Sequence, residues 1–177
     1  MKHESAGTDA DVSNAADVSL DWERLYETHA RQLQRYLVKL TGDQETGTEL
    51  MQETFLRAIR ADIREPAAAR AWLFRTGTNL ALNRRRRQRL VAFIPFTGSE
   101  PSNTAPFDVE AEQVRRALRA VSEDQAATLL LHYESGFTRA EIAPMQGVSE
   151  ETVKSRLARG RKSFISAYRR LERGLAG

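Results

Sequence analysis

TRAEIAPMQGVSEETVKSRLARGRK, residues 138–162, carries the clearest structural signal in this chain. It predicts two short helices joined at Gly147, whose missing side chain lets the backbone adopt the positive φ of a tight turn. Thr138 can cap the first helix and Ser149 the second, because a side-chain hydroxyl accepts the free backbone N–H groups of a first turn. The stretch is therefore predicted to be a helix-turn-helix.

The second of these helices has two different faces. Val153 and Leu157 lie one turn apart and predict a buried face. The other sides carry polar and cationic residues, namely Lys154, Ser155, Arg159 and Lys162. A capped and braced helix with such a face suits the major groove of DNA, where it meets base edges and phosphates. The alternative is a solvated helical hairpin, but the agreement of turn, caps and charges favours DNA reading.

Charge is distributed unevenly along the 177 residues, although the net charge is only +3. Between Thr152 and Arg173 there are eight lysines and arginines against one acid, Glu172. Residues 1–21 hold five acids and one lysine. A basic end and an acidic leader indicate a polyanion as partner and a leader with too little apolar content to fold alone. The charge split also suggests the hypothesis that the leader screens the basic end.

Composition and spacing exclude several other classes. The chain has no cysteine, which excludes disulfides, thiolate metal sites and cysteine nucleophiles. His3, His29 and His132 lack the spacing of metal ligands, and no cofactor is expected. Without a nucleotide-binding loop or the spacing of a catalytic triad, the chain is not expected to be an enzyme. The lack of a signal peptide and of any apolar run of about 20 residues predicts a cytoplasmic protein.

Hydrophobic periodicity and helix breakers divide the chain into four parts. Residues 1–20 are the acidic leader, and residues 21–89 have a strongly helical pattern. Residues 90–107 are rich in proline, glycine, serine and threonine, which predicts a flexible linker. Residues 108–177 are helical again. Because no strand pattern is present, the sequence predicts an all-α fold of two small helical domains.

Three helices are predicted in the first domain. Apolar residues recur at steps of three and four from Trp22 to Leu40, and Gly42 ends this amphipathic helix. A second helix over residues 44–60 has an apolar stripe and a charged face. Pro66 begins the third helix, at the position where its missing N–H costs nothing.

The third predicted helix ends in a run of arginines, residues 84–87. Before this run, Trp72, Thr76, Asn79 and Asn83 follow steps of four, three and four, and so share a face. An aromatic platform, amide donors and guanidinium groups are the components of single-stranded DNA sites. Two alternatives stay open, because Trp72 can be a core residue and the arginines can complement the helix C-terminus.

Five segments, taken in order, resemble a single family. They are LYETHARQLQRYL, ELMQETFLRA, ARAWLFRTGTNLALNRRRR, VRRALRAVSEDQAATLLLHYESGFTRAEIA and GVSEETVKSRLARGRK. Across residues 22–171 the chain resembles the extracytoplasmic-function (ECF) sigma factors of the sigma-70 family, the minimal two-domain class of bacterial transcription initiation factors. The resemblance implies binding to core RNA polymerase and promoter-specific initiation of transcription.

The resemblance also implies roles for individual residues. The second segment docks on the clamp helices of the polymerase β′ subunit, which implies contacts by Glu49, Leu50, Gln52, Glu53 and Phe55. The loop and third helix hold the single strand of the melted −10 element, which implies contacts by Asp62, Arg64, Trp72, Arg75, Asn79, Asn83, Arg84, Arg86 and Arg87. The helix-turn-helix reads the double-stranded −35 element, which implies contacts by Thr138, Arg139, Ser149, Glu151, Thr152, Lys154, Ser155, Arg156 and Arg159. The implied partners are the β and β′ subunits of core polymerase, promoter DNA and an anti-sigma factor.

Five residues depart from the family pattern. Glu49 and Asn83 each stand where an aspartate is usual, so one carboxylate is longer and another is lost. Gly77 lies in the third helix, where it costs about 1 kcal/mol relative to alanine. Pro144 falls inside the first helix of the helix-turn-helix and removes a backbone hydrogen bond, and Gln146 stands where an apolar residue is expected. We therefore predict that this first helix is shortened or kinked.

Two other functions stay open. A stand-alone helix-turn-helix regulator would explain the C-terminal domain, but it leaves the ELMQETF segment and the arginine run without a role. A sigma mimic, which occupies polymerase without starting transcription, is kept open by Gly77, Asn83 and Pro144.

Overall fold

The structure is a computed structural model that describes residues 21–61, 63, 65–91 and 109–175. The leader, most of the linker, and the loop residues Asp62 and Arg64 lie outside these residues, together with the predictions made for them. Within the described ranges the chain forms seven α-helices and one π-helical turn, with no strand. The predicted all-α class is confirmed.

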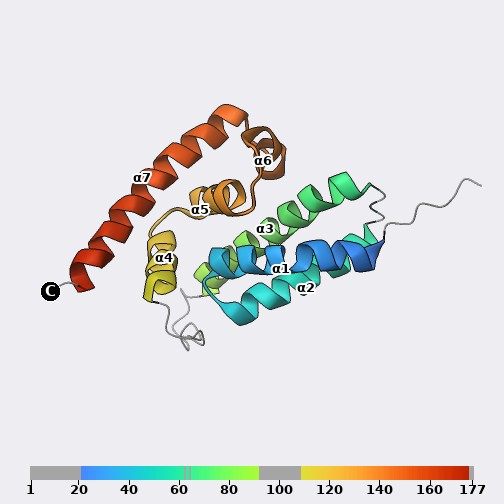
Figure 1. Ribbon diagram of the computed structural model, residues 1–177, viewed down its shortest axis with the longest axis horizontal. Coiled ribbons are helices and arrows are strands. Elements are labelled where there is room, and N and C mark those ends of the chain that lie inside the picture. The colour runs from blue at the N-terminus through green and yellow to red at the C-terminus, as the bar shows by residue number, and fades with distance from the viewer. Residues whose placement is uncertain (1–20, 62, 64, 92–108, 176–177) are drawn as a thin grey trace, which may run out of the picture.

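Helices α1 (Trp22–Thr41) and α2 (Gln44–Arg60) run side by side, joined by a tight turn at Gly42 (Figure 1). Gly42 has a φ of 79°, in the left-handed region that glycine adopts without strain. Both helices begin at a capped residue, because the carboxylates of Asp21 and Asp43 accept a backbone N–H three residues further on, at 3.0 and 2.7 Å. The predicted bounds of these two helices are confirmed.

Helix α3 (Pro66–Val91) packs across α1 and α2 and completes the N-terminal group, α1–α3. It begins at the predicted proline and buries Leu73 and Phe74 completely. Gly77 lies where α3 passes close to both neighbours, since a Cβ there would stand 3.3 Å from side-chain atoms of α1 and of α2. The glycine that weakens the helix locally therefore permits the close approach of three helices.

The rest of the described chain forms the C-terminal group. Its elements are α4 (Val109–Arg119), α5 (Glu123–Leu129), the π-helical turn η1 (Leu130–Glu134), α6 (Arg139–Gln146) and α7 (Glu150–Leu175). The long helix α7 packs against α4, α5 and α6. Figure 1 shows α7, coloured orange to red, on the side of α5 that faces away from the N-terminal group. The predicted helix-turn-helix corresponds to α6, the turn and the first part of α7.

Of the predicted shortening or kink of α6, the shortening is wrong, because the helix continues through Pro144 to Gln146, and the kink stays a prediction. The proline is solvent-exposed and removes only one hydrogen bond of the helix. Both ends are held independently: a capping box forms at Thr138, and the N–H of Val148 donates to the carbonyl of Ala143 at 3.0 Å beyond the C-terminus. These end contacts outweigh the single missing bond in a helix of eight residues.

The two groups pack against each other, mainly through α3, α1, η1 and the segment that leads into α6. The ring of Phe137 lies 5.1 Å from that of Phe74. The guanidinium of Arg70 lies 3.9 Å from the centre of the Phe137 ring and donates a hydrogen bond to the carbonyl of Ser135. The buried residues of the two groups accordingly form one continuous cluster.

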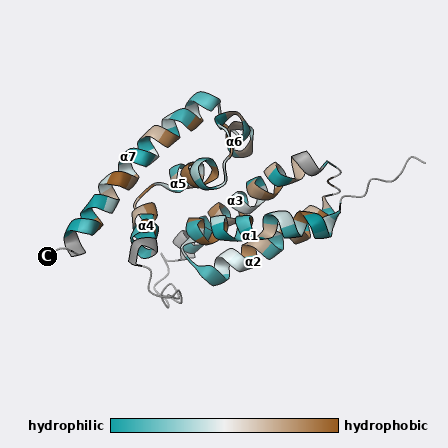
Figure 2. Cartoon of the chain, in the orientation of Figure 1, coloured by the Kyte–Doolittle hydropathy of each residue, from teal (hydrophilic) through white to brown (hydrophobic). Residues whose placement is uncertain are grey.

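Hydrophobic residues gather where the helices meet, as the brown segments of Figure 2 show. Helix α7 carries hydrophilic segments along most of its length, with a few hydrophobic ones between them (Figure 2). None of the helices in the described residues is long and apolar enough to cross a membrane.

Candidate nucleic-acid and partner interfaces

The helix-turn-helix is held at the start of α6 by a reciprocal capping box. The Thr138 hydroxyl accepts the N–H of Glu141 at 3.2 Å, and the Glu141 carboxylate accepts the N–H of Thr138 at 2.8 Å. The Thr138 hydroxyl also donates to the Glu141 carboxylate at 2.8 Å, and the hydrogen bonds that this carboxylate accepts from the N–H and the hydroxyl of Thr138 hold the pKa of Glu141 below its ordinary value. Gly147 ends α6 with a φ of 64°, as predicted for the turn. The side chain of Thr138 is thus used to hold the helix start, although the residue itself is exposed.

The first part of α7 presents one face to solvent. Val153 is fully buried and Leu157 is 8% exposed, as their spacing predicts. The Ser149 hydroxyl accepts the N–H of Thr152 at 3.2 Å and so caps the helix. The predicted contact residues on the exposed side are Arg139, Glu151, Lys154 and Arg159, with Thr152 and Ser155 partly exposed beside them. Charged groups and neutral hydrogen-bond donors are therefore available on one exposed face.

Arg156 is only partly exposed and turns toward other helices, and its assignment as a DNA contact stays a prediction. Its guanidinium donates to Gln146 Oε1 at 2.8 Å and to Asp124 Oδ2 at 3.0 Å, and its side chain is only 21% exposed. Thr128 donates to the same Gln146 oxygen at 3.0 Å. Arg156 therefore ties α7 to α5 and α6 and fixes the angle of the recognition helix. The unexpected Gln146 has a role here as the acceptor that joins the three helices.

The exposed face of α3 matches the prediction in part. Arg75, Asn79 and Asn83 are exposed along this helix. Trp72 is only partly exposed and packs against the core, so its ring has one buried side. This burial supports the alternative of a core residue as much as a stacking platform. The predicted contacts Asp62 and Arg64, in the preceding loop, lie outside the described residues.

The arginine run at the end of α3 has two kinds of environment. Arg84 donates to a carboxylate oxygen of Glu49 on α2 at 2.6 Å, and Arg85 lies 3.7 Å from a carboxylate oxygen of Glu123 on α5. The residues Arg86 and Arg87 are exposed. Half of the run is thus paired with acids of other helices, and half faces solvent.

Helix α2 carries the residues predicted to bind a partner. Glu49 and Gln52 are exposed and Glu53 is partly exposed. Leu50 and Phe55 are each 6% exposed and belong to the core, where they position this face, and their own contacts with a partner stay a prediction. Their side chains point to the α1 and α3 side, since Leu50 lies about 100° and Phe55 about 120° around the helix from the exposed Glu49.

Sequence reasoning missed the apolar residues of this face. Leu56 is 50% exposed and Ile59 is 54% exposed. Leu56 follows Gln52 by four residues and Glu53 by three, so helical spacing alone could have placed it with them. The polar face of α2 therefore contains an apolar centre that a protein partner can cover.

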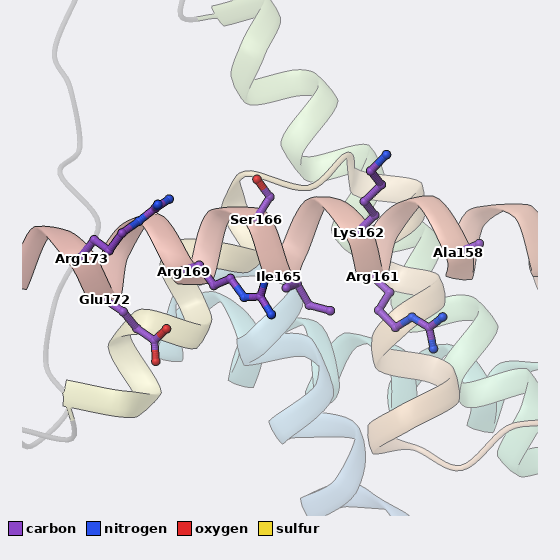
Figure 3. Close-up of a pocket in the computed structure, with 8 residues that line it drawn as sticks. All are labelled: Ala158, Arg161, Lys162, Ile165, Ser166, Arg169, Glu172 and Arg173. Carbon is purple, nitrogen blue, oxygen red and sulfur yellow. The ribbon is translucent and has the colours of Figure 1, made fainter.

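Toward its C-terminal end α7 carries a further cationic surface, which belongs to the basic end noted in the sequence. A shallow groove of about 770 Å³ lies along it (Figure 3), lined by Ala158, Arg161, Lys162, Ile165, Ser166, Arg169, Glu172 and Arg173. Figure 3 shows Lys162 and Arg173 on one side of the helix and Arg161 and Glu172 on the other. All these residues come from α7 itself, so the surface is an uncovered helix face, not an enclosed cavity.

Comparison with known proteins identifies two regions of one family. Residues 25–91 match Sigma-70 region 2, and residues 111–164 match Sigma-70, region 4. The ECF RNA polymerase sigma factor SigL of Mycobacterium tuberculosis is 36% identical over 160 residues, which cover 84% of this chain and 89% of that protein. The ECF RNA polymerase sigma factor SigM of the same organism is 33% identical over 164 residues, which cover 90% and 83%.

A solved structure has the same fold. The sigma factor RpoE of Bartonella quintana, crystallised with the anti-sigma factor NepR, has a TM-score of 0.69 and covers 84% of this chain and 97% of its own. Its sequence identity to this chain is 24%, so this likeness concerns the fold.

The fold defines an all-helical protein of the DNA-binding class, with a helix-turn-helix in its C-terminal group. The chain belongs to the sigma-70 family of RNA polymerase sigma factors, in the ECF class. The resemblance based on the five sequence segments is confirmed. A stand-alone helix-turn-helix regulator is not favoured, because region 2 is matched as well as region 4.

Proposed function

We propose that this sigma factor gives core RNA polymerase its promoter preference by contacting DNA with α7 and α3 and the polymerase with α2. In this proposal, residues 21–89 bind polymerase and the melted −10 element, residues 90–107 connect the domains, and residues 108–177 read the −35 element. Covalent chemistry is left to the polymerase. Such a protein acts in the bacterial cytoplasm, where polymerase and chromosome are.

The exposed face of α7 is the observation that carries the proposal. Arg159 and Lys154 are available to phosphates and bases, while Glu151, Thr152 and Ser155 offer polar groups beside them. The capping box of α6 and the Arg156 contacts keep this face at a fixed angle to the rest of the domain. A rigid polar and cationic helix face of this kind fits direct readout in a major groove.

Helix α3 supplies the single-strand contacts. Asn79 and Asn83 present amides along its exposed face, and Arg86 and Arg87 continue the line with cations. Amides can hydrogen-bond to unpaired base edges, and guanidinium groups pair with phosphates. Holding an extruded base costs a few kcal/mol, which such contacts must offset.

Polymerase binds the exposed face of α2. Glu49, Gln52 and Glu53 provide charge and hydrogen-bonding groups around the exposed apolar side chains of Leu56 and Ile59. An apolar centre with a polar rim is the usual construction of a protein interface. By analogy with its family, we also propose that an anti-sigma factor binds this chain and covers such faces before polymerase binds them.

The N-terminal and C-terminal groups must separate on the promoter. The two promoter elements lie about 25 base pairs, or roughly 85 Å of duplex, apart, whereas a compact chain of this length has a radius of gyration of roughly 16 Å. The contact between the groups suits separation, because the Ser135 hydroxyl is buried there without a hydrogen-bond partner among the described residues. An unsatisfied buried group costs about 1–3 kcal/mol, and that cost is relieved when the groups part.

Run-off transcription tests the proposal. Purified core polymerase is supplied with a pool of genomic promoter fragments, with and without this protein, and the transcripts are sequenced. New discrete transcripts that share two upstream elements are the expected result. Binding to core polymerase without any transcript would instead indicate a sigma mimic, and the absence of binding to core would overturn the proposal.

A pair of variants locates the two DNA contacts. We expect Arg159→Ala to weaken transcription from promoters with the upstream element, while Arg170→Ala, an exposed cation far along the same helix, serves as the matched control. The double variant Arg86→Gln with Arg87→Gln is expected to weaken binding of the holoenzyme to a single-stranded non-template oligonucleotide. Equal effects of the Arg159 and Arg170 variants would mean that α7 contributes only general positive charge.

A further inference from the structure

The arginine run of α3 is only half available in the compact protein. Arg84 and Arg85 each lie against a carboxylate from another helix, while Arg86 and Arg87 are exposed. The run is part of the proposed single-strand site, so acids on other helices compete with DNA phosphates for two of its cations. The position of each competing acid determines at which step of assembly Arg84 or Arg85 becomes available to DNA.

Arg84 is held by an acid that faces the polymerase. Its Nη1 lies 2.6 Å from Glu49 Oε2, and the two side chains are 38% and 52% exposed. Arg84 also contributes to the lowered pKa of Asp43, after the hydrogen bonds from Thr46, so a second carboxylate lies on the same side. Glu49 shares the exposed face of α2 with Gln52 and Leu56, which is the face proposed for polymerase. A basic group of the polymerase that forms an ion pair with Glu49 would release Arg84.

Arg85 is held by an acid of the other helical group. It lies 3.7 Å from Glu123 in the first turn of α5, and the two side chains are 24% and 14% exposed. This pair joins α3 to the C-terminal group, so it breaks when the two groups separate. Separation and polymerase docking thus act on adjacent arginines of the same run.

We propose that Glu49 and Glu123 mask Arg84 and Arg85 in the free protein, and that polymerase docking and separation of the groups release them to the single-stranded DNA. This inference rests on the proposed function of α3. Glu49 and Glu123 then compete with DNA phosphates for these two arginines. The contribution of Arg84 and Arg85 to single-strand binding therefore grows as the holoenzyme assembles. The free protein would then bind single strands weakly, with Arg86 and Arg87 alone.

The expected effect of each acid is modest. An ion pair as exposed as that of Arg84 stabilises by about 1 kcal/mol at most, which corresponds to roughly a five-fold change in an equilibrium constant. Removing the acid is therefore expected to raise the affinity of the free protein for a single strand by about two- to five-fold at low salt. The gain should shrink as salt rises, because screening weakens both the pair and the DNA contact.

The experiment uses the full chain without polymerase and a short fluorescent single-stranded oligonucleotide of mixed sequence, with binding followed by anisotropy. Glu49→Gln and Glu123→Gln are each expected to tighten binding, and the double variant to combine the gains. Glu53→Gln is the matched control, because it removes the same charge from the same helix, yet Glu53 pairs with Arg57 on α2 at 2.7 Å. Circular dichroism melting verifies that every variant is folded.

Three results would overturn the inference. The first is an unchanged affinity in both glutamine variants. The second is an equal gain in Glu53→Gln, which would mean that net charge alone is responsible. The third is a gain from Glu49→Gln that persists when Arg84→Gln is added. Failure of the proposed function is seen separately: the holoenzyme would then bind the oligonucleotide equally well with and without Arg86→Gln and Arg87→Gln.

Discussion

Arg156 and Arg84 are both cations assigned to DNA contact by sequence, and the structure treats them differently. Arg156 contacts two partners inside its own helical group, Gln146 and Asp124, and keeps 21% of its side chain exposed. Arg84 contacts Glu49 on a neighbouring helix, and both side chains are well exposed. The first contact is part of the fold, and the second can be exchanged for a contact with a ligand.

The energetic difference follows from solvent exposure. Hydrogen bonds to a partly buried charged group contribute about 1.5–3 kcal/mol, whereas an exposed ion pair contributes about 1 kcal/mol or less. If Arg156 turned toward DNA, it would therefore lose the stabilisation from both of these hydrogen bonds. Arg84 would lose only the small stabilisation of an exposed ion pair, so it can exchange Glu49 for another partner during assembly at little cost.

The largest expected effect is that of Arg156→Ala. It removes hydrogen bonds to Gln146 and Asp124 and leaves the partly buried amide oxygen of Gln146 with one donor among the described residues, Thr128. We expect the free energy of unfolding of the C-terminal group to fall by about 2–3 kcal/mol, because both contacts involve a charged donor. Urea unfolding followed by circular dichroism measures this change.

Arg159→Ala is the matched control for that variant. Arg159 is exposed and donates only to the Ser155 hydroxyl one turn away, at 2.6 Å. We expect little change in stability and a clear loss of affinity for duplex promoter DNA. If Arg156→Ala left stability intact and weakened DNA binding as strongly as Arg159→Ala, the structural role given to Arg156 would be wrong.

Arg70→Ala is expected to have the next largest effect, on the contact between the two groups. It removes the cation over the Phe137 ring and the hydrogen bond to the Ser135 carbonyl, together worth about 1–2 kcal/mol. The equilibrium between compact and separated states should shift toward separation without unfolding either group. Because the chain has no cysteine, a dye pair at Gln44→Cys and Arg170→Cys can report the distance cleanly.

The control for this second variant is Arg75→Ala, an exposed cation of the same helix α3. It should leave the transfer efficiency between the dyes unchanged. An equal change in both variants would mean that charge on α3, and not the Arg70 contact with Phe137, holds the groups together.

Sequence alone predicted the features that depend on neighbouring residues in the chain. The ends of α1 and α2, the start of α3 at Pro66 and the turn at Gly147 follow from local caps, breakers and periodicity. The buried Val153 and Leu157 follow from helical spacing. These predictions hold because the interactions that cause them span only a few residues.

What the sequence did not reveal concerns side chains whose partners are distant in sequence. Arg156 turns inward because Asp124, on α5, and Gln146, across the turn, accept its hydrogen bonds. Phe55 is buried and Leu56 is exposed because α1 and α3 cover the apolar stripe of α2, on which Phe55 lies, and leave the side of Leu56 open. Family resemblance implies that α2 binds polymerase, but tertiary packing decides which of its side chains a partner can reach.

Thr138→Ala should have a smaller and more local effect than either arginine variant. It removes the hydroxyl that accepts the Glu141 N–H in the capping box, and loss of an N-cap costs about 1 kcal/mol. The start of α6 should fray, so amide hydrogen exchange should accelerate there and remain unchanged in α1. Thr138→Ser, which keeps the hydroxyl, is the control and should behave like the parent; equal exchange in Thr138→Ala and Thr138→Ser would show that the cap contributes nothing.

The smallest effect is the pH dependence that Glu141 gives to the C-terminal group. Hydrogen bonds from Thr138 lower the pKa of Glu141 in the folded state below its ordinary value of 4.5. The stabilisation is therefore complete above that value and is lost as the pH falls through the lowered pKa, because protonation weakens the acceptor. Urea unfolding from about pH 7 to about pH 3.5 should show a shallower acid loss for Glu141→Gln than for the parent. Glu150→Gln, an exposed acid in the first turn of α7, is the comparison, and an identical change in slope for both variants would rule out the capping box as its cause.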